Sequence, residues 1–247
     1  MATPYVTRIE DRVHSTQNFA RKEFETLADG VPVLVIAQSQ DAGRGRTGNP
    51  WWNSPRSMLA SVAMPSPHDD SVTLAPLAAG IAAHDTISSE MGVATTLKWP
   101  NDVMVGPIKV GGILAELSDA VLVVGCGINL WWPEAPVGAG GLLDHDPGWP
   151  AAVDLAHHWA GRLIGALEGL PDTFDKSSYV EICGTVGRQI TWEPAGSGRA
   201  VGITSDGALL VDTAGGQRTL RSGEVSHVRA ATISSQQPGG GDDEVCN

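Results

Sequence analysis

A segment of alternating glycines and arginines carries the strongest chemical signal in this sequence. It runs Gly43-Arg44-Gly45-Arg46-Thr47-Gly48, with Gln40 shortly before it and Trp51 shortly after it. Glycine lets the backbone approach an anion closely, and guanidinium groups bind carboxylates and phosphates through paired hydrogen bonds. The spacing therefore predicts an anion-binding loop. The alternative interpretation is a flexible surface loop with solvated arginines.

Lysines mark a second candidate segment further along the chain. Lys98-Trp99-Pro100-Asn101-Asp102 leads into Lys109-Val110-Gly111-Gly112-Ile113-Leu114. A lysine beside two glycines offers a mobile positive charge on a backbone that can pack closely. Together with the arginine loop, these segments predict a site that binds a carboxylate and a phosphate at once. The alternative is a surface lysine in a hairpin turn and a rigid turn at residues 99–102.

Several common kinds of site are excluded by the same residues. Residues 43–48 match GxGxxG, but Asn49-Pro50 follows where a dinucleotide site needs a helix to begin. The sequence has no GxxxxGK[ST] phosphate motif and no evident Ser/His/Asp set. The three cysteines are widely spaced, which indicates neither a disulfide framework nor a zinc site and favours a reducing cytoplasm.

Charge and length narrow the class of protein further. The formal net charge of −12 argues against a general nucleic-acid binder but allows a local basic pocket. The N-terminus lacks the features of a secretory signal, and the apolar runs are too short to span a bilayer. The length of 247 residues fits one large domain, alone or with a small appendage.

Apolar periodicity predicts the elements that must position these residues. Helices are predicted over residues 73–90 and 151–168. Strands are predicted over residues 31–37, 57–64, 95–97, 103–105, 110–117 and 120–124. The turn-rich joints between the later strands suit an antiparallel or mixed sheet. Residues 125–129 are interpreted as a strand end, and residues 131–150 as a loop.

After Tyr179 the pattern changes to short strands separated by tight turns. Strands are predicted over residues 189–192, 198–204, 208–212, 217–220 and 225–228. Asp206-Gly207 and Gly215-Gly216 are strong signals for tight turns. Several short strands close together suggest a small barrel. The polar, glycine-rich residues 231–247 are predicted to be disordered.

The order of these motifs resembles that of the biotin–protein ligases, the biotin–[acetyl-CoA-carboxylase] ligases, from about Val13 to Arg229. The matching segments are Ser15-Thr16, the arginine loop with Trp51, residues 98–102, residues 109–114, residues 125–129, and residues 206–211 with 222–225. The resemblance implies an α+β, class II synthetase-like catalytic domain over residues 1–180, a mixed sheet with helices on one side. It also implies a small C-terminal SH3-like barrel over residues 185–230.

The reaction implied by this resemblance has two steps. Biotin and ATP give biotinyl-5′-AMP and pyrophosphate, and a lysine of a biotin carboxyl carrier domain of a carboxylase then takes the biotin. Lys109 would bridge the biotin carboxylate and the α-phosphate, while Arg44 and Arg46 would clamp the adenylate. Mg²⁺ is implied with ATP, held mainly by phosphates and water, and its protein ligands stay unassigned.

Further residue roles follow from the same resemblance. Biotin contacts are implied for Ser15, Thr16, Gln17, Gln40, Arg44, Gly45, Arg46, Lys109 and Gly112. ATP contacts are implied for Arg46, Trp51, Asn101, Asp102, Lys109 and Asn129. Two positions depart from the family pattern. Gln17 stands where Asn is frequent, and Asn49-Pro50 stands where basic residues are frequent, which makes the loop less positive and stiffer.

The resemblance also sets expectations about partners. The matching pattern begins near residue 13, so we expect no N-terminal helix-turn-helix domain and no DNA binding. The protein is expected in the cytoplasm, without a membrane, as a monomer or homodimer. A lipoate–protein ligase is one alternative function, and a non-catalytic regulator that binds biotin or an adenylate is another.

Overall fold

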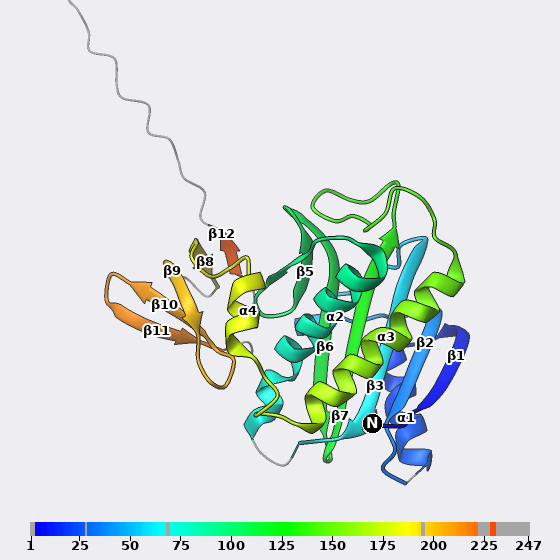
Figure 1. Cartoon of the computed structure of the whole chain (residues 1–247). Helices are drawn as coiled ribbons and strands as arrows, with labels where there is room; N and C mark the ends of the chain where they lie inside the picture. Colours follow the sequence, from blue (N-terminus) through cyan, green and yellow to red (C-terminus); the bar gives the residue numbers. More distant parts are fainter. Residues whose placement is uncertain (1–2, 28, 68–69, 194–195, 222–227, 231–247) are drawn as a thin grey trace, which may run out of the picture.

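Two β-sheets organise the chain, as the computed structural model in Figure 1 shows. The structure describes residues 3–27, 29–67, 70–193, 196–221 and 228–230. The larger sheet has the strand order β1-β2-β3-β7-β6-β5-β4. Its strands are β1 (Val6–Val13), β2 (Val33–Gln40), β3 (Arg56–Pro65), β4 (Thr96–Lys98), β5 (Asp102–Val105), β6 (Ile108–Ser118) and β7 (Val121–Trp131). β1 pairs with β2 in parallel and the other neighbours are antiparallel, which confirms a mixed sheet.

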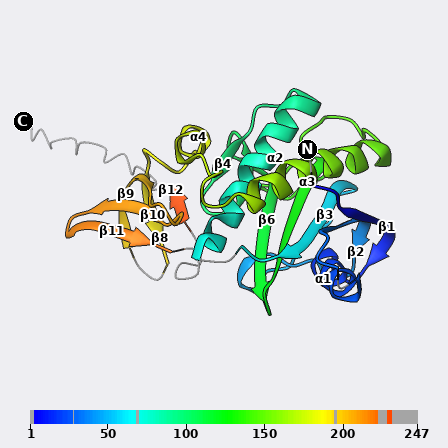
Figure 2. The same ribbon diagram turned by 60° about the horizontal axis from the view of Figure 1, so that its bottom comes forward.

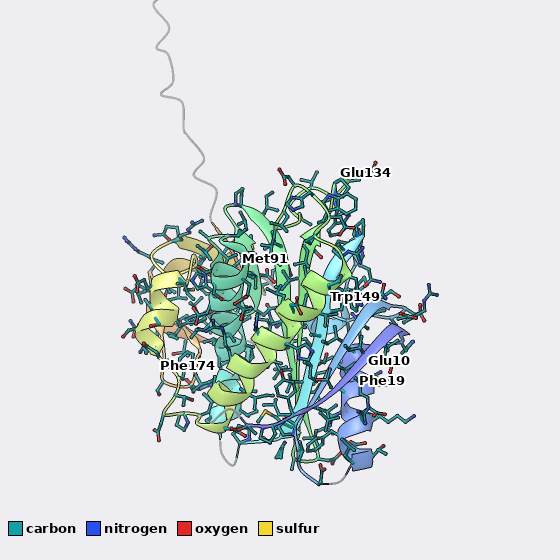
Figure 3. The ribbon with its side chains drawn as sticks, turned by 45° about the vertical axis from the view of Figure 1, so that its right-hand side comes forward. Glu10, Phe19, Met91, Glu134, Trp149 and Phe174 are labelled. Carbon is teal, nitrogen blue, oxygen red and sulfur yellow. The ribbon has the colours of Figure 1, made fainter. Side chains whose placement is uncertain are left out.

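Helices cover both faces of this sheet, so the prediction of helices on one side only is wrong. Figure 2 shows α2 (Ala75–Met91) and α3 (Trp149–Glu168) on one side and α1 (Thr16–Leu27) on the other. The apolar run of β2 explains this arrangement, because alternate side chains point to opposite faces. Leu34 and Ile36 pack in the core with α2 and α3, whereas Val33 and Val35 pack with α1. Figure 3 shows Phe19 of α1 near the edge strand β1 and its Glu10.

The helices predicted from apolar periodicity are confirmed. α2 follows a short 3₁₀ turn, η2 (Asp70–Leu74), and ends at Gly92, whose φ of 65° is the left-handed conformation that glycine adopts readily. α3 begins two positions before the predicted start at residue 151, and its Trp159 and Leu163 are fully buried. β1, α1 and the short helix α4 (Lys176–Ile182) have no counterpart among the predicted elements.

One strand boundary was predicted wrongly. Residues 125–129 lie inside β7, a continuous strand that pairs with β3 on one side and β6 on the other. The two glycines of this segment suggested a strand end. Pairing with β3 on one side and with β6 on the other keeps the backbone extended through residues 125–129. The following loop, predicted over residues 131–150, carries Glu134 outward at the top of Figure 3.

The smaller sheet confirms the predicted C-terminal strands where the structure describes them. Its order is β11-β10-β9-β8-β12, with β8 (Gln189–Trp192), β9 (Gly196–Ile203), β10 (Leu209–Thr213), β11 (Gly216–Leu220) and β12 (Val228–Ala230). Within the described residues this sheet is open, so closure into an SH3-like barrel stays a prediction, as do the boundaries at residues 180 and 185. The predicted strand over 225–228 lies largely outside the described residues, and the predicted disordered tail over 231–247 lies wholly outside them.

The turn between β4 and β5 contacts the small C-terminal sheet. The indole Nε1 of Trp99 donates a hydrogen bond to the carbonyl oxygen of Gly207 at 3.0 Å, and its backbone N–H donates to Thr185 Oγ1 at 3.0 Å. Trp99 is 1% exposed. This segment was predicted as part of an anion-binding site, with a rigid turn as the alternative, and through Trp99 it also links the two sheets.

Candidate active site

A cavity of about 200 Å³ lies on the α1 face of the large sheet. The alternation along β7 explains its position. Val121 and Val123 pack against α1 on this face, while the next residues of the same face are Gly125 and Gly127. Because glycine has no side chain, the sheet surface is hollow beyond the end of α1.

This cavity brings together nearly all of the predicted site residues. The lining includes Ser15, Thr16, Gln17, Gln40, Arg44, Gly45, Arg46, Trp51, Asn101, Asp102, Lys109 and Gly112. Asn129 is outside this lining and is buried at the same face of β7, with no hydrogen-bond partner for its Oδ1 among the described residues. The arginine loop and the lysine segments thus meet at one place, far apart as they are in sequence.

One end of the cavity is a polar wall at the start of α1. Gln40 Oε1 accepts hydrogen bonds from the backbone N–H and the hydroxyl of Thr16, at 2.8 and 3.1 Å. Ser61 donates to the Thr16 hydroxyl at 2.8 Å. Ser15 Oγ and Gln17 Oε1 are buried without a partner among the described residues. Since buried polar atoms are normally hydrogen-bonded, this wall is suited to a polar ligand.

Arg44 lies at the same end. Its Nη2 donates to Asn18 Oδ1 at 2.8 Å and lies 3.4 Å from Glu116 Oε2. Gln17 Nε2 donates to the same Glu116 oxygen at 3.1 Å. Glu116 belongs to the face of β6 that carries Gly112, so strand alternation brings a carboxylate beside the arginine loop.

The arginine loop itself is a short hairpin. An isolated bridge pairs Arg44 with Pro50, the Gly45 N–H donates to the Asn49 oxygen at 2.7 Å, and the Trp51 N–H donates to the Gly43 oxygen at 2.8 Å. The tip is the 3₁₀ turn η1 (Arg46–Gly48). Pro50 therefore closes the hairpin rather than disrupting it.

Arg46 contacts the turn between β4 and β5. Its Nη1 lies 3.4 Å from Asn101 Oδ1. Burial lowers the pKa of Arg46, and the negative charge of Asp102 opposes that change. A guanidinium stays charged under such a perturbation, so Arg46 supplies a partly desolvated positive charge.

Lys109 shares a carboxylate with a second lysine. Lys109 Nζ lies 2.5 Å from Asp102 Oδ1, and Lys98 Nζ lies 3.9 Å from Asp102 Oδ2. We call these three residues the lysine–aspartate cluster. The loop after β7 holds the backbone of Lys109 through two hydrogen bonds. The Lys109 N–H donates to the carbonyl oxygen of Gly138 at 2.9 Å, and the Lys109 carbonyl oxygen accepts from the Gly140 N–H at 3.0 Å.

Trp51 lies against a pair of glycines that face each other across β6 and β7. Gly112 and Gly127 are direct partners in the ladder. A Cβ on Gly127 would lie 2.5 Å from Trp51 Cζ2, and one on Gly112 would lie 3.1 Å from Cζ3. Lys109 Nζ is 6.0 Å from the indole centroid, a cation–π distance. A side chain at Gly127 would displace the indole from the sheet, whereas a Cβ at Gly112 would make a tight contact that a shift of a few tenths of an ångström relieves.

Comparisons with known proteins decide the family. Residues 9–129 match the Biotin/lipoate A/B protein ligase family, and residues 190–228 match the Biotin protein ligase C terminal domain. The chain is 30% identical to the biotin–[acetyl-CoA-carboxylase] ligase of Mycobacterium tuberculosis, over 82% of this chain and 81% of that protein. The chain belongs to the biotin protein ligase family.

Other members of the biotin protein ligase family show the same likeness. The biotin–[acetyl-CoA-carboxylase] ligase of Paracoccus denitrificans is 29% identical over 77% of this chain and 88% of that protein. A biotin protein ligase from Aquifex aeolicus, solved in complex with biotin and ATP, superposes with a TM-score of 0.73. It is 25% identical and covers 92% of this chain and 99% of its own.

Three residues at this cavity were missed in the sequence. Lys98, Glu116 and Gly127 each lay inside a recognised segment, but nothing local distinguished them. The alternation of β6 from Gly112 to Glu116 was the available signal for the carboxylate. Cys126 also borders the cavity, and burial raises the pKa of its thiol, so it is not a nucleophile at neutral pH.

Two structural findings concern metals and membranes. Within the described ranges, no three His, Cys, Asp or Glu residues are grouped as metal ligands. In the same part of the chain, none of the helices combines the length and apolar character needed to cross a bilayer.

Proposed function

We propose that this chain is an ATP-dependent biotin–protein ligase that forms biotinyl-5′-AMP and transfers biotin to a lysine of a biotin carboxyl carrier domain. The observation that carries the proposal is the convergence of Arg44, Arg46 and Lys109 on one cavity. Relatives over most of the chain are biotin ligases, and the Aquifex aeolicus ligase binds biotin and ATP.

The chemistry needs no nucleophile from the protein. A biotin carboxylate oxygen attacks the α-phosphorus of ATP, and the bond to the β-phosphate breaks with its electron pair leaving on pyrophosphate. The carrier amine then attacks the acyl carbon, loses a proton, and AMP leaves with the electron pair of the C–O bond. Because two unit charges repel by about 4 kcal/mol at 4 Å and an effective dielectric of 20, positive groups must hold the acids together.

The cavity suggests how the two substrates divide it. Biotin would occupy the polar wall, where Ser15, Thr16, Gln17 and Gln40 offer hydrogen-bonding groups. Arg44, Gly45 and Gly112 would border its chain, and Arg46 and Lys109 would stand at the join with the α-phosphate. The adenosine side would use Trp51, Asn101, Asp102 and Asn129. These roles rest on the position of each residue in the cavity and on the family, and each role can be tested by substituting the residue.

The donor set fits Mg²⁺ bound mainly through ATP. Asp102 supplies a carboxylate among the described lining residues, and it is already engaged by two lysines. Mg²⁺ usually combines one or two carboxylates with substrate phosphates and water. When bound, the ion would neutralise phosphate charge, while the orientation of the substrates falls to the chain's own residues.

The match of residues 190–228 to the Biotin protein ligase C terminal domain favours biotin over lipoate as the acid substrate. The carrier domain as partner, a monomeric or homodimeric state, a cytoplasmic location and the lack of DNA binding remain our proposals. A gel-shift assay that showed sequence-specific DNA binding would contradict the last of these.

The decisive experiment uses the purified chain with ATP, Mg²⁺ and either biotin or lipoate. We expect pyrophosphate release with biotin, and a mass increase of one biotin on an added carrier domain. Modification by lipoate instead would identify a lipoate ligase. Binding of biotin without pyrophosphate release would identify a regulator, and either result would overturn the proposal.

A further inference from the structure

The side-chain amide of Gln17 is held by two hydrogen-bond acceptors of strand β6. Its Nε2 donates to Glu116 Oε2 at 3.1 Å and to the carbonyl oxygen of Leu114 at 3.3 Å. A carboxylate and a carbonyl oxygen can only accept hydrogen bonds, so the nitrogen of the amide must face them. The orientation of the Gln17 amide therefore follows from the chemistry of its two partners.

The other end of this amide is an acceptor that lacks a partner. Gln17 is 6% exposed, and its Oε1 is buried with no hydrogen-bond partner among the described residues. The oxygen lies over Gly125, since a Cβ there would be 2.8 Å from it, and both residues line the cavity. Leaving a buried acceptor unpaired is unfavourable. This part of the polar wall is therefore suited to a ligand that donates a hydrogen bond.

Glu116 acts on the polar wall from behind. It is not one of the described residues that line the cavity, and its Oε2 also lies 3.4 Å from Arg44 Nη2. One carboxylate oxygen thus contacts both the start of α1 and the arginine hairpin. Because a charged acceptor strengthens a hydrogen bond, and because its contact is the shorter one, Glu116 holds the Gln17 amide more firmly than Leu114 does.

We propose that Glu116 is a positioning residue for the acid substrate. It holds the Gln17 amide with its oxygen towards the cavity, where that oxygen accepts a hydrogen bond from a ureido N–H of biotin. This inference rests on the proposed function. Biotin carries two ureido N–H donors, whereas the dithiolane ring of lipoate carries none. An amide fixed in this orientation therefore favours biotin over lipoate.

Loss of the Glu116 carboxylate has a specific consequence for biotin. The Gln17 amide is then free to turn about its last side-chain bond and to present Nε2 to the ureido N–H, which opposes two donors. Biotin binding should weaken, while the use of ATP should not change. A loosened fold would instead impair the use of both substrates, and an effect transmitted through Arg44 would not depend on Gln17.

The test measures biotin-dependent pyrophosphate exchange, and biotin binding by calorimetry, for the wild type, Glu116→Leu and Glu116→Gln. We expect Glu116→Leu to raise Kd and KM for biotin by about 10-fold and to leave KM for ATP within about 2-fold, since the change unpairs one buried polar group. Glu116→Gln still offers an oxygen to Gln17 Nε2, so its Kd for biotin should stay within about 3-fold of the wild type. Glu25→Leu, on the exposed side of α1, is the matched control.

A second substitution identifies the route of the effect. Gln17→Asn shortens the side chain by one bond of about 1.5 Å, which removes its contact with Glu116. Adding Glu116→Leu in this background should change Kd for biotin by no more than about 2-fold.

A ligand analogue tests the hydrogen bond itself. In a cyclic carbamate analogue of biotin, an oxygen atom replaces one ureido N–H, which removes a donor without adding bulk. One of the two isomers should bind the wild type about 10-fold more weakly than biotin, because two acceptors then face each other. In Glu116→Leu this difference should fall to about 3-fold or less, because the amide can turn.

Three results would each overturn the inference: unchanged biotin binding in Glu116→Leu, equal losses for biotin and ATP, or a loss for biotin that persists in the Gln17→Asn background. A wild-type chain that binds biotin but releases no pyrophosphate would defeat the proposed function alone. The calorimetric comparison would still decide the role of Glu116 in that case.

Discussion

Replacing Gly127 with alanine tests how the sheet positions Trp51. The new Cβ would lie 2.5 Å from Cζ2 and 2.7 Å from Cε2 of the indole, whereas ordinary contacts are 3.4–4 Å. Gly127 pairs with Leu59 of β3 and Gly112 of β6, so the ladder holds its backbone in place. The indole must therefore move away from the sheet by about 1 Å, into the cavity.

This displacement should impair ATP use more than stability. Trp51 lies beside Lys109, and a misplacement of about 1 Å can cost on the order of 10²-fold in rate. We expect kcat/KM for ATP in pyrophosphate exchange to fall by about that factor. The free energy of unfolding should change by less than about 1 kcal/mol, because the clash is with a loop side chain and alanine restricts the unfolded chain.

The assay is biotin-dependent pyrophosphate exchange, with urea unfolding measured in parallel. Gly165→Ala is the matched control, since a Cβ at this exposed position of α3 meets nothing within 4 Å. It should keep wild-type kinetics and stabilise the helix by roughly 0.5–1 kcal/mol.

A double substitution identifies the route of the effect. In a Trp51→Ala background the ring is gone, so adding Gly127→Ala should lower kcat/KM by no more than about 3-fold. Wild-type kinetics in Gly127→Ala alone would refute the reasoning. So would a full loss that persists when Trp51 is absent.

Three further outcomes are expected. Lys109→Ala should lower the adenylation rate by on the order of 10²–10³-fold, because Lys109 would contact both reacting groups. The loss in Arg44→Ala should be smaller. Equal losses of pyrophosphate exchange in the two variants, with normal circular dichroism spectra, would contradict this ranking. Trp99→Phe removes the buried hydrogen bond to Gly207 and should lower the free energy of unfolding by about 1–3 kcal/mol in urea titrations; an unchanged midpoint and slope would count against it. The paired hydrogen bonds from Arg56 lower the pKa of Asp146 to about 2, so the stabilisation that this ion pair gives the folded chain is present above pH 3.8 and is lost as the pH falls towards 2. Between those pH values the free energy of unfolding should fall less in Asp146→Asn than in the wild type. Parallel pH profiles of the two proteins would exclude this role for the pair.

Much of the architecture was predictable because burial leaves a periodic trace in sequence. The apolar run at the start of β2 and the three- and four-residue spacing of α2 and α3 gave elements that the structure confirms within a few residues. β1 and α1 left weaker traces. Most side chains of β1 are not buried, and only three residues of α1 are buried.

The membership of the site was also largely predictable. Glycines between arginines, and lysines beside glycines, restrict which ligands a loop can bind, whatever the surrounding fold. The order of those motifs pointed to the biotin protein ligase family, and the match at both ends of the chain confirms it.

The sequence by itself determined the charged groups, the turn residues and the apolar faces, because each depends on side-chain chemistry and on neighbours along the chain. Tertiary structure alone decided which groups meet. Lys98 and Lys109 share Asp102, Glu116 reaches Arg44, and Gly112 and Gly127 receive the ring of Trp51. Those contacts depend on strand register and on how loops cross the sheet, which are set by packing over the whole domain rather than by any local pattern.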